Sequence, residues 1–67
     1  MAVARVTEIS STSTTSFDDA IEQGISRATK TLRNVRGAWV KEQRVDVRDD
    51  RITQYQVNLM VTFVLDD

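Results

Sequence analysis

The side chains that most often perform catalysis or bind transition metals are absent from this chain. Its 67 residues include no Cys and no His. Thiolate nucleophiles, disulfides, cysteine zinc sites and imidazole general bases are therefore excluded. Any catalysis would rest on carboxylates, Lys, Arg, Tyr or Ser, and no nucleophile with a matching base can be named. We expect a protein that binds its ligand and is not an enzyme.

Carboxylates are the remaining candidates for metal chemistry. The acidic residues beyond position 40 are Glu42, Asp46, Asp49, Asp50, Asp66 and Asp67. Clustered carboxylates hold hard cations such as Ca²⁺, but the ligand spacing of an EF-hand loop is absent. We interpret most of these residues as solvated turn groups and keep a divalent cation site as the alternative.

The charge balance limits the classes of partner. Nine basic and ten acidic residues give a formal net charge of -1. Residues of both signs are interspersed along the chain, which provides no concentrated basic surface for DNA or RNA. No apolar run approaches the roughly 20 residues that span a bilayer, and no apolar signal-peptide segment begins the sequence. We expect a cytoplasmic protein with no nucleic-acid partner and no membrane association.

An amphipathic helix is the best-supported element. Apolar or small residues recur at helical spacing from Phe17 to Val35, so they lie on one stripe. Ser16 precedes them, and its hydroxyl can accept a hydrogen bond from a backbone N–H of the first turn. Gly24 lies within the stripe, where it costs about 1 kcal/mol relative to Ala. We expect another segment to approach the helix closely at Gly24.

Two β-type regions flank this helix. Residues 3–9 are rich in β-branched side chains and predict a short strand, and residues 10–16 (S-S-T-S-T-T-S) predict a polar connector. A ligand or phosphorylation loop is the alternative for that connector. Beyond the helix, residues 38–48 and 51–65 predict two long strands joined by a tight turn at Asp49 and Asp50. A change of alternation between Val40 and Val45 predicts a β-bulge there.

The last strand defines the core face and the topology. Its alternation places Tyr55, Val57, Leu59, Val61, Phe63 and Leu65 on one face. An all-antiparallel sheet then requires this third strand at its centre. The expected fold is a single α+β domain, residues 1–67, with β-α-β-β order and a three-stranded antiparallel sheet packed on one helix.

The strands are too long for the core of one small chain. Fifteen residues at about 3.3 Å each span roughly 50 Å, whereas a compact domain of this size has a radius of gyration near ~11 Å. A chain of this length usually needs a disulfide, a metal or oligomerisation for stability, and the first is excluded by composition. The sequence therefore predicts a homo-oligomer.

The sequence resembles the dodecins along essentially its whole length. The matching segments are the T-S loop, the D-A-I helix start, T-L-R-N-V-R-G-A-W-V-K-E-Q-R-V, and Q-Y-Q-V-N-L-M-V-T-F-V-L-D-D. Dodecins are β-α-β-β subunits assembled as hollow dodecamers, and many bind flavins in stacked pairs between tryptophans at subunit interfaces. The resemblance implies a homododecamer that stores or sequesters a flavin such as FMN, riboflavin or FAD.

The resemblance also implies site residues. In flavin-binding dodecins the stacking tryptophan follows the helix in a W-F-E-V type segment, and the alignment places Gly37 there, with Trp39 two residues later. Residues two apart on a strand face the same side, so Trp39 points to the same surface, displaced by about 6 to 7 Å. Arg44 matches the arginine near the phosphate or ribityl tail. Gln56 matches the glutamine that bonds the isoalloxazine edge.

A second reading of the same residues predicts no flavin. The G-A-W-V segment is closer to a branch called calcium dodecins, which keeps the assembly without the usual flavin tryptophan. Tryptophan is also a common interface anchor, so Trp39 would then fill a contact between subunits. In that case the protein is a structural shell or interaction module, with a divalent cation as its candidate ligand.

Overall fold

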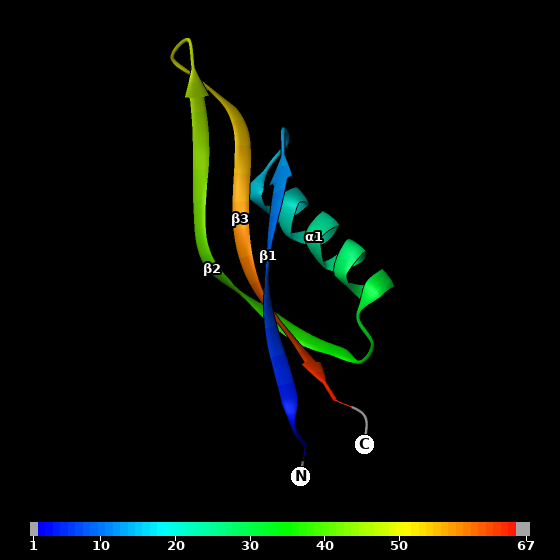
Figure 1. Ribbon diagram of the computed structural model, residues 1–67. Coiled ribbons are helices and arrows are strands. Elements are labelled where there is room, and N and C mark those ends of the chain that lie inside the picture. The colour runs from blue at the N-terminus through cyan, green and yellow to red at the C-terminus, as the bar shows by residue number, and fades with distance from the viewer. Residues whose placement is uncertain (1, 66–67) are drawn as a thin grey trace.

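Three antiparallel strands and one helix build the molecule, for which a computed structural model describes residues 2–65 (Figure 1). The elements are β1 (Ala4–Ser13), α1 (Phe17–Thr31), β2 (Val35–Arg48) and β3 (Arg51–Val64). The sheet order is β1-β3-β2, with both neighbours antiparallel to β3. The predicted β-α-β-β order and the central position of the third strand are confirmed.

Strand β1 is longer than the sequence predicted. It continues through Ser13 into the hydroxyl-rich segment, where Ser10 lies opposite Asn58 and Ser13 opposite Tyr55. The prediction of a connector over residues 10–16 was therefore wrong for its first four residues. Pairing with the central strand satisfies their backbone groups and outweighs the turn preference of Ser and Thr.

The helix begins as predicted and ends earlier. Ser16 is its N-cap, and its hydroxyl accepts a hydrogen bond from the backbone N–H of Asp19 at 3.0 Å. The predicted stripe ran on to Val35, but α1 ends at Thr31 and Val35 already belongs to β2. Asn34 has a φ of 61°, a left-handed conformation that a continuing α-helix does not allow. This turn redirects the chain into the sheet.

The core lies between α1 and the β1 and β3 strands. Its buried hydrophobic residues are Ala20, Ala28, Val57, Leu59 and Val61. Gly24 faces this layer, and a Cβ placed on it would lie 3.1 Å from both Leu59 Cδ1 and Ser11 Cβ. The close approach predicted at Gly24 is confirmed, and it explains why the helix carries a residue without a side chain there.

The β2–β3 hairpin carries the predicted irregularity. Its register shifts between Val40 and Glu42, within the interval where the alternation changed phase, and the predicted bulge is confirmed. Asp49 and Asp50 form the turn with φ values of 53° and 63°. Two successive left-handed residues are the geometry of a type I′ turn, which suits the twist of a two-residue hairpin.

The molecule is elongated because the hairpin projects beyond the helix (Figure 1). Its principal extents are 51 × 19 × 13 Å and its radius of gyration is 13.8 Å. The accessible surface is 5119 Å², against about 4,300 Å² for a compact monomer of this mass. Val47 and Ile52 are exposed at the projecting end. Among the described residues, no helix has the length and apolar character needed to cross a membrane.

Candidate functional site

The four predicted site residues share the face of the sheet that α1 does not cover, here termed the helix-free face. Across the β2–β3 ladder the pairs are Gly37 with Thr62, Trp39 with Met60, and Arg44 with Gln56. Opposed residues project to the same face, and the even positions of β3 alternate with the buried Val57, Leu59 and Val61. The fold therefore brings Gly37, Trp39, Arg44 and Gln56 onto one surface.

Trp39 supplies the aromatic surface of this site. Its side chain is 52% exposed although it is the largest in the chain. It stands on the edge strand β2 opposite Met60, and Trp39 also borders a hollow of about 380 Å³ between β2 and α1. An exposed indole can stack on a flat ring.

The polar part of the site lies further along the same face. Met60 and Gln56 are four residues apart on β3, so Trp39 and the Arg44–Gln56 pair are separated by about 13 Å at the backbone. A ligand that contacts both must therefore be elongated. An aromatic head near Trp39 and a polar part near Arg44 satisfy the spacing.

Gln56 is held by neighbours that the sequence did not single out. Its Nε2 donates to Ser10 Oγ at 3.0 Å and to Asn58 Oδ1 at 3.4 Å. Asn58 Nδ2 in turn donates to Glu42 Oε1 at 2.9 Å. The strand alternation places Asn58 on this face, but the contacts with Ser10 and Glu42 depend on the register of all three strands.

Two exposed ion pairs lie on the helix-free face within the described part of the chain. Arg44 Nη2 lies 3.2 Å from Asp46 Oδ1, and Lys41 Nζ lies 3.1 Å from Glu8 Oε1. Exposed pairs of this kind contribute about 0 to 1 kcal/mol. Arg44 can therefore exchange Asp46 for an anionic group of a ligand at little cost.

The acidic residues do not gather into a metal site within residues 2–65, where no three such side chains come together. Glu42 and Asp46, two of the sequence candidates, bond Asn58 and Arg44 instead. Asp49 and Asp50 form the hairpin turn. Asp66 and Asp67 lie outside the described residues.

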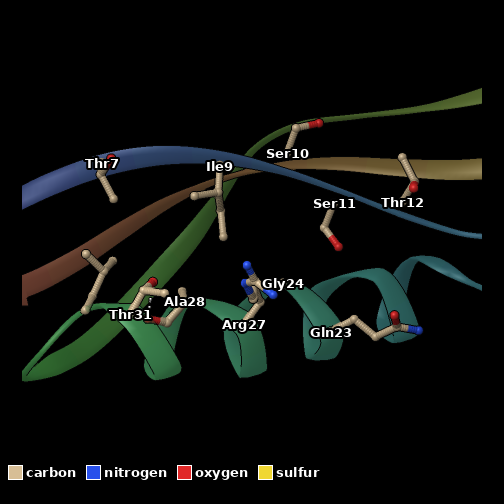
Figure 2. A pocket seen from close by; sticks show the side chains of 11 residues that line it. Thr7, Ile9, Ser10, Ser11, Thr12, Gln23, Gly24, Arg27, Ala28 and Thr31 are labelled. Atoms are coloured by element: carbon tan, nitrogen blue, oxygen red, sulfur yellow. Dashed lines mark hydrogen bonds between the residues drawn. The ribbon is translucent and has the colours of Figure 1, made fainter.

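A larger hollow lies on the opposite side of the sheet and includes none of the four predicted residues. It measures about 590 Å³ and lies between β1 and α1. Figure 2 shows Ile9 and Ser11 pointing from β1 toward the helix, whereas Ser10 points to the other side. This picture agrees with the contact between Ser10 and Gln56 on the helix-free face.

Comparisons with known proteins agree on one family. The family model described as Dodecin matches residues 3–66. The chain is similar to the dodecin from Streptomyces davaonensis, with 41% identity, a TM-score of 0.92, and coverage of 98% of this chain and 97% of that chain. It is also similar to the dodecin from Streptomyces coelicolor, with 32% identity, a TM-score of 0.92, and coverage of 98% of this chain and 94% of that chain.

A third similar structure is described as that of a calcium-binding protein. It is a calcium-chelating immunodominant antigen from Mycobacterium tuberculosis, a calcium dodecin with a novel calcium-binding site. Its identity to the chain is 32%, its TM-score 0.82, and the coverage is 97% of this chain and 93% of that chain. No curated protein matches the chain.

Proposed function

The chain belongs to the dodecin family, and on that basis we propose that it stores or sequesters a flavin in the cytoplasm as a hollow homododecamer. In this proposal the flavin is FMN, riboflavin or FAD, and it is held without turnover. The absence of Cys and His agrees with a protein that binds rather than converts its ligand.

The observation that carries this proposal is the placement of Trp39, Arg44 and Gln56 on one face. Offset stacking of an indole on an isoalloxazine contributes about 0.5 to 1.5 kcal/mol beyond burial. Gln56 is then the hydrogen-bonding partner of the ring edge, and Arg44 the partner of the phosphate or ribityl tail.

Position 37 supports the use of Trp39 as the stacking residue. A Cβ at Gly37 would meet no atom within 4 Å, so there is open space beside the strand where the family alignment has its tryptophan. The indole of Trp39 starts two residues away and on the same face. In the proposal it leans into this space and takes the place of the ring that Gly37 lacks.

Assembly is supported by the surface that one chain leaves uncovered. The hairpin extends past the helix, and its exposed Val47 and Ile52 have no apolar cover from α1. Burying such side chains against another copy removes apolar area from water. Sedimentation should give a particle about twelve times the 7.6 kDa of one chain, and Val47→Asp with Ile52→Asp should shift it to smaller species. A wild-type monomer at micromolar concentration would contradict the assembly.

Flavin binding is tested by fluorescence. The fluorescence of riboflavin or FMN should be quenched when the protein is added, because a stacked indole donates an electron to the excited flavin ring. Trp39→Ala should remove the quenching while leaving the circular dichroism spectrum unchanged. Trp39→Phe keeps an aromatic face for stacking but lacks the indole donor, so as the matched control it should quench less than the wild type. Unchanged flavin fluorescence at a several-fold excess of wild-type protein rules the proposal out.

A second candidate function is supported by the similarity to the calcium dodecin. In this case the shell binds a divalent cation and no flavin. No acidic triad forms within residues 2–65, and in this candidate the ligands come together between chains. Calorimetric titration with Ca²⁺ separates the two candidates. Heat of binding with Ca²⁺ and none with riboflavin supports the second, and the reverse supports the first.

A further inference from the structure

The orientation of the Asn58 amide follows from its contact with Glu42. A carboxylate accepts hydrogen bonds and has no N–H to donate. The group that faces it must therefore be the Asn58 Nδ2, as the 2.9 Å contact to Glu42 Oε1 shows. The other end of the same amide, Oδ1, then faces Gln56 and acts as an acceptor.

That acceptor determines the orientation of the Gln56 amide in turn. A primary amide has two N–H donors on its nitrogen and one carbonyl oxygen. Gln56 Nε2 uses its donors on Asn58 Oδ1 at 3.4 Å and Ser10 Oγ at 3.0 Å. The remaining hydrogen-bonding atom of the side chain is Oε1, which can only accept.

We propose that Glu42, Asn58 and Ser10 are positioning residues that make Gln56 an acceptor, and thereby select a ligand whose ring edge donates an N–H. This inference rests on the proposed function and refines it. The imide of a flavin has such a donor at N3, between two carbonyl groups. A flat ring that presents only acceptors along this edge would face the Gln56 oxygen without a hydrogen bond.

The inference makes a specific statement about flavin analogues. Methylation at N3 removes the donor and leaves the stacking surface of the ring intact. In the wild type, 3-methylriboflavin should bind about tenfold more weakly than riboflavin, because a satisfied acceptor is replaced by one without a partner. Riboflavin is neutral, so the comparison is insensitive to the net charge of the variants.

Two variants test the positioning residues. Asn58→Leu removes the acceptor that holds the Gln56 nitrogen, and Glu42→Gln replaces the obligate acceptor by a group that also donates. Both should lower the riboflavin to 3-methylriboflavin preference to about threefold or less, because Gln56 can then rotate its amide. Glu8→Gln is the matched control, since it makes the same charge change on the same face but contacts Lys41. The inference is overturned if the preference for riboflavin over 3-methylriboflavin is the same in Asn58→Leu, Glu42→Gln and Glu8→Gln.

A measurement without ligand separates this inference from the proposed function. The side-chain amide resonances of Gln56 and Asn58 in a nitrogen-15 spectrum report their hydrogen bonds directly. Glu42→Gln should shift both, and Glu8→Gln neither. A Glu42→Gln variant that shifts Asn58 and leaves Gln56 unmoved shows that the orientation is not passed on, which overturns the inference. Absence of flavin binding by the wild type defeats the proposed function, and this spectrum still decides the arrangement of the amides.

Discussion

The two faces of the sheet differ in what their side chains contact. On the helix-covered face, Val57, Leu59 and Val61 are buried against α1. On the helix-free face, the intervening residues Gln56 and Asn58 are half-buried and bond polar groups of β1 and β2. One strand, β3, thus supplies the core with its odd residues and the candidate site with its even residues.

This difference separates stability from recognition along a single strand. Apolar burial contributes most where packing excludes water, while exposed hydrogen bonds and ion pairs contribute little net free energy. Polar residues can therefore be arranged for a ligand on the helix-free face without weakening the core. Substitutions one residue apart on β3 should have very different consequences.

The largest effect is expected at Leu59, which is the largest fully buried side chain. Leu59→Ala should lower the free energy of unfolding by about 2 to 5 kcal/mol. Asn58→Ala, one residue away, should lower it by about 0.5 to 1.5 kcal/mol, since water can replace its partners. Urea unfolding must be compared at one protomer concentration, because assembly adds to stability. Similar losses for the two variants would abolish the distinction between the faces.

The next effect tests the contact between helix and sheet. Gly24→Ala introduces a methyl group 3.1 Å from Leu59 Cδ1 and Ser11 Cβ. Overpacking costs about 1 to 3 kcal/mol and the gain in helix propensity returns about 1 kcal/mol, so a net loss of roughly 1 kcal/mol is expected. Ser26→Ala, on the exposed side of α1, should instead be neutral or slightly stabilising. Thermal unfolding measures both, and a stabilising Gly24→Ala would contradict the tight approach.

A smaller gain is expected at the hairpin tip, beyond the cover of the helix. Asp50 has a φ of 63°, and Gly adopts this conformation without a steric penalty. Asp50→Gly should stabilise the chain by about 0.5 to 1 kcal/mol and leave flavin binding unchanged. Asp50→Val, a β-branched residue, should do the opposite. Unfolding curves in which both variants behave alike would show that the turn conformation does not limit stability.

The smallest effect is expected for the ion pair on the helix-free face. Lys41→Met removes the 3.1 Å contact with Glu8 Oε1 and should change the unfolding free energy by less than about 0.5 kcal/mol. Added salt should leave the difference from wild type near zero, because an exposed pair is screened. A loss above about 1 kcal/mol would show that this face also carries stability.

The fold could be predicted from the sequence wherever periodicity alone decides. The requirement for an all-antiparallel sheet placed the third strand at the centre. A change in the alternation of apolar side chains located the bulge after Val40. The strand character of Ser10 to Ser13 was missed because it comes from pairing with β3, which local turn preferences do not encode. The end of α1 was missed because the apolar stripe continues past Asn34, whose left-handed backbone carries the turn.

The candidate site was predictable as a face, and its hydrogen bonds were not. Two-residue alternation is enough to place Trp39 with Gly37 and Gln56 with Asn58. The contacts of Gln56 with Ser10, and of Asn58 with Glu42, require the registers of β1 and β2 against β3. The register of β2 shifts at the bulge, so strand periodicity alone does not identify the facing residues.

The central position of β3 also has a consequence for the order of events during synthesis. Both β1 and β2 pair with this strand and not with each other. While a ribosome is still adding residues 51–64, β1 has no complete partner strand. The long-range pairing of Ala4 with Val64 is among the last that can form. The hairpin should therefore form first and β1 should dock afterwards, so the sheet is completed only once nearly the whole domain has emerged.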